Sequence, residues 1–312
     1  MKRTRWLVAL TVALALTAAA CGNGGSGDTE ELSGTIKVDG SSTVAPLSEA
    51  AAELFQADHS GVRVTVGTSG TGGGFEKFCN GETDISDASR PIKQEEIDAC
   101  AAKSITYEEI TVALDGLSVI VHPENDWADC LTVEQLEKVW EPGSKVGNWK
   151  EIDPSFPDED LSLFGAGTDS GTFDYFTDAV NGEEGASRTD YNATEDDNVT
   201  VNGVAGTKGG LGYLGLSYVE ENQGKIKTVQ IDGGNGCVAP TTETVQDGTY
   251  TPLSRPLFVY PTATALERPE VEAFLRFYIE SAHDIAEQAL FVPLTEAMQT
   301  EATEKIESLL TG

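Results

Sequence analysis

The hydrophobic and polar positions of this chain follow two periods, one typical of strands and one typical of helices. Thr35–Asp39 and Val62–Val66 place apolar residues at every second position, and Leu161–Phe164 is a third short apolar segment. Leu47–Phe55 and Phe173–Val180 instead repeat apolar residues at helical spacing. Strands that alternate with helices favour an α/β protein whose mostly parallel sheets are covered by helices.

Three of the predicted strand–helix junctions are rich in glycine and hydroxyl residues. They are Gly40–Thr43, Gly70–Gly74 and Gly165–Thr172. Glycines let backbone amides approach a ligand closely, and a helix N-terminus carries about half a positive charge. Ligands of open parallel sheets lie beyond the carboxyl ends of the strands, where these junctions are expected. The sequence therefore predicts a site for an anion where the three junctions meet.

The helix starts can also be predicted. Ser42 or Thr43 can cap the first helix, with Pro46 in its first turn, where a missing N–H is tolerated. Gly70–Gly74 is expected to form a turn before a helix that begins near Phe75. Further helices are predicted from a capping box at Thr132–Gln135 and from the apolar faces of Val271–Tyr278 and Ile285–Leu290.

The N-terminal residues have the features of an export signal. Basic Lys2, Arg3 and Arg5 precede the apolar run Leu7–Leu16, which is too short to span a membrane. Small residues before Cys21 resemble a bacterial lipoprotein processing site, so residues 1–20 are expected to be removed and Cys21 lipidated. Residues 21–33 lack an apolar period and are expected to form a tether. The alternative is a secreted chain without a lipid.

Four further cysteines favour disulfides over a metal site. An even number of cysteines in an exported chain is typical of disulfide bonding, and four cysteines allow three pairings. A zinc site is not expected, because there is no C-x-x-C motif and the three histidines are scattered. The cysteines are Cys79, Cys100, Cys130 and Cys237, and the histidines are His59, His122 and His283.

The composition of the chain limits the classes of molecule that it can be expected to bind. The formal net charge of −32 argues against nucleic acid and anionic lipid surfaces. A recessed site remains open to a small anion, because the Debye length is about 8 Å at physiological salt and the nearest donors dominate. About 290 residues follow the predicted signal, and 39% of the chain is hydrophobic, which is enough for two lobes.

Four motifs, in order, resemble the phosphate-binding subunit of phosphate ABC importers. They are Gly40–Pro46, the glycine-rich turn at Thr71, Asp84–Pro91 and Asp169–Thr172. The similarity extends over nearly the whole chain after the signal. It implies a type II periplasmic-binding-protein fold, with two lobes that each contain a mixed, mostly parallel sheet flanked by helices. A hinge of two crossing segments would join the lobes.

The resemblance also implies how the chain is divided. Lobe I would comprise 34–115 and 256–312, and lobe II 116–255, with crossings near Ala113–Leu117 and Ser254–Val259. Of the three cysteine pairings, we favour the one in which each disulfide closes a loop inside one lobe. It joins Cys79 to Cys100 and Cys130 to Cys237.

The resemblance assigns anion-binding roles to hydroxyls and amides of the three junctions. These residues are Ser42, Thr43, Thr71, Ser170, Gly171 and Thr172. The chain departs from the family at two positions, with Ser89 where many members have a carboxylate and Ala166 where many have an arginine. Ser89 is still expected to be one of the residues that bind the anion. A dehydrated anion needs a compensating cation. Arg90 is our first candidate for it and Arg188 the second.

The absence of a carboxylate at position 89 affects how the site would distinguish phosphate from sulfate. Phosphate keeps a proton at neutral pH and sulfate keeps none, so a buried acceptor against the ligand would reject sulfate. Asp87, Asp169 and Asp197 are candidates for this acceptor. Without one of them, hydroxyl oxygens or backbone carbonyls would have to accept the proton.

The function expected from the resemblance is binding of inorganic phosphate outside the cytoplasm and its delivery to the permease subunits of an ABC importer. We expect a lipid-anchored monomer that needs no cofactor or metal. One alternative is a secreted serine hydrolase or phosphatase using Ser170, although Gly167–Gly171 is not a G-x-S-x-G motif. The chain could also bind a different oxyanion such as sulfate, or serve as an adhesion or signalling module that binds no anion.

Overall fold

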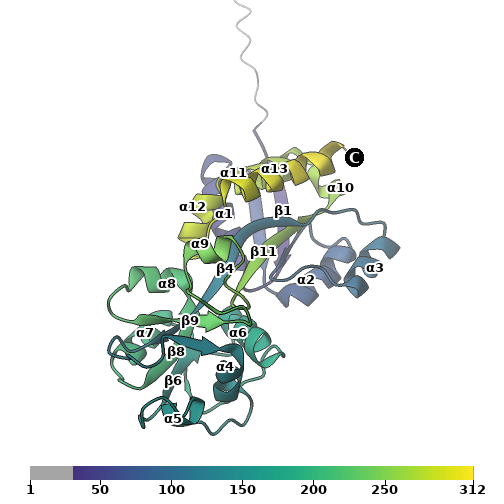
Figure 1. Ribbon diagram of the computed structural model, residues 1–312. Coiled ribbons are helices and arrows are strands. Elements are labelled where there is room, and N and C mark those ends of the chain that lie inside the picture. Colours follow the sequence, from purple (N-terminus) through teal and green to yellow (C-terminus); the bar gives the residue numbers. More distant parts are fainter. Residues whose placement is uncertain (1–30, 312) are drawn as a thin grey trace, which may run out of the picture. The chain divides into compact units, whose positions relative to one another are not determined.

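A computed structural model describes residues 31–311, which form a mixed α/β fold (Figure 1). Eleven strands belong to its sheet system. The strands are β1 (Gly34–Gly40), β2 (Val62–Gly67), β3 (Ile85–Ala88), β4 (Ile110–Val121), β5 (Cys130–Thr132), β6 (Ser162–Ala166), β7 (Asn192–Thr194), β8 (Gly210–Gly215), β9 (Lys227–Asp232), β10 (Cys237–Val238) and β11 (Ser254–Pro261).

The helices contain most of the predicted apolar faces. The predicted capping box is also present, because the Thr132 hydroxyl accepts a hydrogen bond from the Gln135 amide. They are α1 (Ala45–Asp58), α2 (Gly70–Cys79), α3 (Gln94–Ala102), α4 (Val133–Trp140), α5 (Trp149–Ile152), α6 (Gly171–Asn181), α7 (Asp197–Ala205), α8 (Leu216–Glu221), α9 (Thr242–Gln246), α10 (Ala263–Leu266), α11 (Pro269–Glu280), α12 (Ala282–Gln288) and α13 (Glu296–Thr311).

The strands are ordered β2-β1-β3-β11-β4-β8-β6-β7, and β9 connects β4 to β5 and β10. Strands β2, β1 and β3 are parallel, as are β8, β6 and β7, whereas β11 is antiparallel to both β3 and β4. Strand β4 pairs with β11 over its first half and with β8 and β9 over its second half. Figure 1 shows β4 and β11 running between an upper group of elements, which includes β1 and α1, and a lower group, which includes β8 and β6.

Two main hydrophobic cores lie on either side of this crossing. The first contains Phe55, Ala113 and Leu257, and the second contains Leu114 and Leu253. On β4, and at the start of β11, the core therefore changes within a few residues of the predicted crossings. The division into two lobes stays a prediction, and the separation of the two cores supports it.

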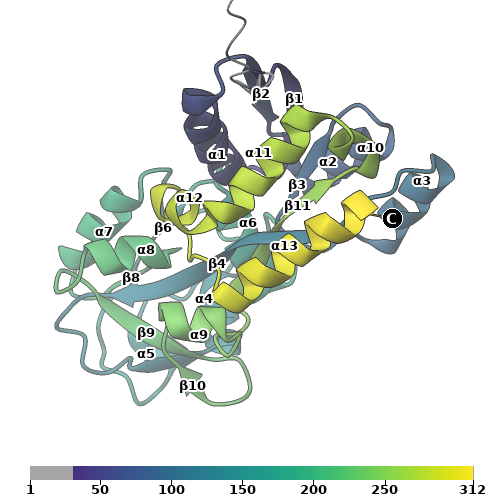
Figure 2. The same ribbon diagram turned by 90° about the horizontal axis from the view of Figure 1, so that it is seen from above.

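The C-terminal elements lie against the crossing. Val292 packs in the second core, and its backbone exchanges two 2.9 Å hydrogen bonds with that of Leu114. Helix α13 then lies along β4, as Figure 2 shows, and places Ile306 in the first core. The C-terminal segment thus contacts both cores.

Both predicted cysteine pairings are present in the structure. Cys79 is bonded to Cys100, which joins α2 to α3, and Cys130 is bonded to Cys237, which joins β5 to β10. The export signal over residues 1–20, lipidation at Cys21 and all but the end of the tether 21–33 lie outside the described residues. Among residues 31–311, no helix is both long and apolar enough to cross a membrane.

Two predicted helix starts are wrong. Helix α2 begins at Gly70, not near Phe75, so the glycine-rich stretch is itself the first turn of the helix. A Cβ on Gly74 would lie 2.5 Å from the Cα of Gly40, so glycine is required for α2 to pack this closely against the end of β1. Val44 is the N-cap of α1 and has no side-chain bond, so neither Ser42 nor Thr43 caps that helix.

Candidate anion-binding site

The carboxyl ends of β1, β3 and β2 meet at one edge of the sheet, because these neighbouring strands are parallel. The residues that follow them all line one cavity of about 500 Å³. We call this side the near wall, and its members are Ser41–Thr43, Ser69–Gly73 and Ser89–Arg90. The structure thus brings five predicted site residues together at one cavity, namely Ser42, Thr43, Thr71, Ser89 and Arg90.

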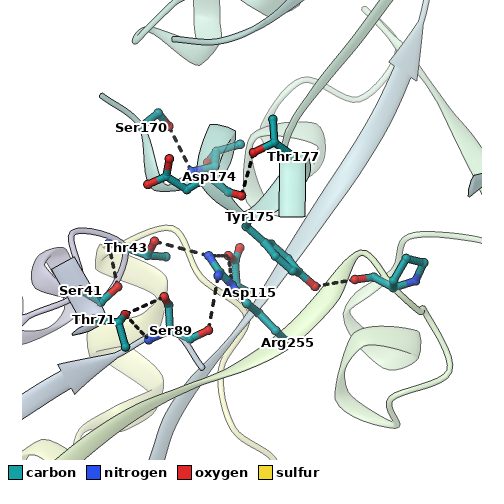
Figure 3. Close-up of polar contacts among 12 residues, drawn as sticks. Ser41, Thr43, Thr71, Ser89, Asp115, Ser170, Asp174, Tyr175, Thr177 and Arg255 are labelled. Atoms are coloured by element: carbon teal, nitrogen blue, oxygen red, sulfur yellow. Dashed lines mark hydrogen bonds and ion pairs between the residues drawn. The ribbon is translucent and has the colours of Figure 1, made fainter. Parts of the chain in front are cut away.

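The near wall offers hydroxyls and the beginnings of two helices. Neither α1 nor α2 has a side-chain cap on its first-turn amides. An anion can accept from the first-turn amides of α2 and interacts favourably with the helix dipole. In α1 the Ala45 and Leu47 amides already donate to the carbonyls of Ser41 and Val44, so that helix offers mainly its dipole. Thr71 and Ser89 join their hydroxyls at 3.0 Å, and the Ser89 amide donates to Thr71 Oγ1 at 3.2 Å (Figure 3). The near wall is therefore a preformed set of mostly uncharged donors.

The opposite side of the cavity carries charged and aromatic side chains. We call it the far wall, which consists of Asp174, Tyr175 and Asp178 on α6 together with Glu184 and Arg255. Of these residues, Asp178 and Glu184 are exposed, whereas Asp174 and Arg255 are partly buried and Tyr175 is buried. None of the five was predicted from the sequence.

Arg255 is the cation at the centre of the site. Its Nε and Nη2 donate to Asp115 Oδ2 at 3.2 and 3.1 Å, and Asp115 is on the other crossing strand, β4. Nη2 also lies 3.4 Å from Thr43 Oγ1, and Nη1 lies 3.3 Å from the Ser89 carbonyl (Figure 3). The last two contacts are at the long end of hydrogen-bond distances, so an anion can replace them at little cost.

Burial raises the pKa of Asp115, and the charge and hydrogen bonds of Arg255 oppose this increase. The guanidinium remains charged in proteins and has five donors, of which these contacts use four. Arg255 can therefore keep its ion pair with Asp115 and still donate to an anion in the cavity.

Arg90, our first candidate for the cation, lines the cavity but already has a carboxylate partner. Its Nη1 and Nη2 donate to the two carboxylate oxygens of Glu96 at 2.9 and 2.7 Å. Glu96 is in the first turn of α3 and also accepts from the Lys93 amide. This bidentate pair engages both terminal nitrogens of Arg90 with two carboxylate oxygens, whereas Arg255 bonds a single oxygen of Asp115.

Arg188, the second candidate, does not line the cavity. It is 7% exposed, and its guanidinium donates to the carbonyls of Val139 and Val146 at 3.1 and 2.9 Å and to Asp190 at 2.7 Å. These contacts tie the segment after α6 to the end of α4. The structure thus places Arg188 in a structural role.

The predicted residues of α6 lie beside the cavity and are not among those that line it. Ser170 is the N-cap, and its Oγ accepts from the Thr172 amide at 3.2 Å. Gly171 packs against Thr43, because a Cβ built on Gly171 would lie 2.1 Å from Thr43 Oγ1. The third junction therefore meets the first one directly, and glycine is what permits this contact.

None of the three predicted proton acceptors lines the cavity. Asp87 is fully buried and accepts from Ser48 at 2.9 Å, its second oxygen has no partner, and burial raises its pKa to about 7. Asp169 is exposed, and Asp197 begins α7. Asp174 does line the cavity, and its pKa is raised by burial and by nearby Glu184.

The sequence contains a weak indication of Arg255, which precedes a proline at the start of a strand that was expected to form one of the crossings. Its carboxylate partner is 140 residues away, so no local motif shows the pair. Asp174 follows the third junction by two residues, and in the predicted helix it lies off the apolar face, at a position expected to face solvent. Within residues 31–311, no group of side chains is suitable for holding a metal ion.

Comparisons with known proteins show to which family the chain belongs. Residues 26–282 match the family model of the PBP superfamily domain. The chain is 45% identical over 280 residues to protein SphX of Synechococcus elongatus, covering 89% of this chain and 82% of that protein. It is 40% identical over 290 residues to the phosphate-binding protein PstS of Staphylococcus aureus, covering 92% and 86%.

A solved structure gives the same assignment. A crystal structure described as that of a possible phosphate binding protein from Planctomyces limnophilus is 47% identical and superposes with a TM-score of 0.85. The match covers 90% of this chain and all of the other. The chain belongs to the PstS-type family of phosphate-binding proteins, within the PBP superfamily.

Proposed function

We propose that this protein binds inorganic phosphate in the cavity between the near and far walls and delivers it to an ABC importer. The observation that carries the proposal is the position of Arg255. Its guanidinium faces the cavity beside Thr43 and Ser89, and α1 and α2 begin on the same side without side-chain caps. The phosphate-binding relatives support phosphate as the anion.

The donors of the near wall would hold the phosphate oxygens, and Arg255 would compensate the charge. Hydrogen bonds to charged groups contribute about 1.5–3 kcal/mol each. Four or five of them are enough for the roughly 8 kcal/mol of micromolar binding and for part of the desolvation cost. Ser42, Thr43 and Thr71 are the hydroxyl donors that we propose.

Asp174 is the residue that we propose as the acceptor of the phosphate proton. It is a partly buried carboxylate of the cavity, and its pKa is raised, so it is poised to share a proton with the ligand. Sulfate has no proton to donate and would leave the carboxylate facing an anion. Asp174 would thus replace the carboxylate that Ser89 does not provide.

The chemistry of the site favours binding over hydrolysis. Ser170, the nucleophile that a hydrolase would use, accepts a hydrogen bond as the cap of α6 and does not line the cavity. The residues that line the cavity within 31–311 include no histidine to act as its base. We propose a binder that is not an enzyme, exported and anchored through lipid on Cys21, acting as a monomer with permease subunits as partners.

Calorimetry of the purified protein with phosphate and sulfate tests the proposal. We expect one phosphate per chain and much weaker binding of sulfate. Equal affinities would refute the phosphate assignment, and heat with neither ion would favour a module that binds no anion. Turnover of phosphate esters that is lost in Ser170→Ala would support the hydrolase instead.

A further inference from the structure

The guanidinium of Arg255 is held between a carboxylate and an aromatic ring. Its Cζ lies 3.8 Å from the centre of the Tyr175 ring, and Asp115 accepts from Nε and Nη2 (Figure 3). Tyr175 is on α6 and packs in the second core, whereas Thr43 and Ser89, which also contact Arg255, precede α1 and follow β3. One cation therefore touches both sides of the cavity.

The ring of Tyr175 is itself fixed at its far end. Its hydroxyl donates to the carbonyl of Pro252 at 2.6 Å, three residues before Arg255. Tyr175 is 7% exposed, and burial raises its pKa above the usual range, so the hydroxyl stays neutral. Helix α6 and the segment that leads into β11 are thus joined through the aromatic side chain that supports the guanidinium.

We propose that Tyr175 is a positioning residue for anion binding, which holds the Arg255 guanidinium toward the near wall. A planar guanidinium stacks well on an aromatic face, and the attraction increases where water is excluded. Without the ring, Arg255 would keep its bonds to Asp115 but could rotate away from Thr43 and Ser89. This inference rests on the proposed function, because the anion to be bound is the phosphate assigned there.

The test is a double-mutant cycle on phosphate affinity. Tyr175→Leu should weaken phosphate binding about tenfold, the effect of losing a desolvated cation–π contact. In an Arg255→Met background the same substitution should change affinity by less than about twofold, because the cation it positions is gone. A residue that supports only the fold would weaken binding equally in both backgrounds, and that outcome would overturn the proposal.

Two matched variants separate the ring from the hydroxyl. Tyr175→Phe keeps the aromatic face and should retain affinity within about threefold, since one neutral hydrogen bond is lost. Tyr191 also packs on the second core and donates its hydroxyl to a backbone carbonyl, that of Ala166 at 2.7 Å, but it does not line the cavity. Tyr191→Leu should leave affinity unchanged, and a loss equal to that of Tyr175→Leu would contradict the proposal.

A measurement without ligand keeps the inference distinct from the proposed function. In NMR spectra of the unliganded protein, the Arg255 side-chain resonances should show a ring-current shift that disappears in Tyr175→Leu and persists in Tyr175→Phe. If the wild-type protein bound no phosphate but showed this shift, the proposed function would fail and the positioning would stand. If phosphate bound and the shift was absent, the positioning would be wrong.

Discussion

The two walls of the cavity are built in different ways. The near wall consists of short segments that follow parallel strands, and it offers hydroxyls, glycines and two uncapped helix starts. The far wall supplies charges whose partners lie far away in the chain, such as Arg255 with Asp115. The near wall also has an arginine, Arg90, whose carboxylate partner Glu96 is only six residues away in the chain. The hydrogen-bond donors of the near wall therefore come from short continuous segments of the chain. The position of the Arg255 cation depends instead on pairing between distant segments.

The largest expected effect comes from removing the far-wall cation. Arg255→Met should weaken phosphate binding about 100-fold, because loss of a desolvated charge contact costs about 3 kcal/mol. Arg90→Met is the matched near-wall control, since it also removes a cavity arginine with a carboxylate partner, and it should cost less than about fivefold. Calorimetry measures both. A greater loss for Arg90→Met would reverse our assignment of the cation.

The next effect concerns the direct contact between the third and first junctions. Gly171→Ala would place its Cβ 2.1 Å from Thr43 Oγ1, so the two segments must separate. Such overpacking costs about 1–3 kcal/mol, and we expect an affinity loss of about tenfold. Gly147→Ala is the control outside the cavity, because its Cβ would meet only the Lys145 carbonyl, at 3.8 Å. Equal losses of phosphate affinity in the two variants, measured by calorimetry, would show that the contact between Gly171 and Thr43 does not specifically support binding.

A smaller effect should appear in selectivity. Asp174→Asn should lower the ratio of phosphate to sulfate affinity about tenfold, because an amide can donate to sulfate where the carboxylate repels it. Asp87→Asn should leave the ratio unchanged, since Asp87 does not line the cavity. Competition binding with both ions distinguishes the two carboxylates. Unchanged selectivity in Asp174→Asn would remove it as the acceptor.

The smallest effect on phosphate binding is expected at Asp87, whose titration should instead affect the stability of the fold. The pKa of Asp87 is about 7 in the folded protein, against an ordinary value of 3.8, so the folded state binds the extra proton between these values. The free energy of unfolding should therefore decrease as pH rises from about 4 to about 7. Ionisation of the buried Asp87 carboxyl is unfavourable, because one of its oxygens has no hydrogen-bond partner.

Asp87→Asn should remove this dependence and raise Tm at pH 8 more than at pH 4. Thermal unfolding at both values measures it, with the exposed acid Asp169→Asn as control. A Tm gain of the same size at pH 4 and pH 8 would contradict the assignment to Asp87.

Two of the three parts of the near wall could be predicted from local patterns in the sequence, whereas Ser89–Arg90 was indicated only by the family resemblance. Ser42 and Thr71 follow alternating strands and precede apolar helical faces, and both patterns occur within about 20 residues. The start of α2 was missed because glycine is normally unfavourable within a helix. Here the close packing of Gly74 on Gly40 outweighs that preference.

The cation of the site could not be predicted, because its identity depends on which side chains meet across the fold. Arg90 looked like a free cation until the first turn of α3 placed Glu96 against it. Arg188 was the second candidate for the cation, but its guanidinium is buried among backbone carbonyls. Arg255 had no motif of its own, and its role follows from the pairing of β4 with β11.

The hydrogen bonds between Leu114 and Val292 have a mechanical consequence. Leu114 on β4 is paired with Pro256 on one edge and with Val292 on the other, so the crossing is three segments wide at this point. A ladder of this kind can flex across its face, but sliding within its plane would break backbone bonds. We therefore expect any movement between the two cores to be an elastic bend with a preferred resting angle, as in a leaf spring.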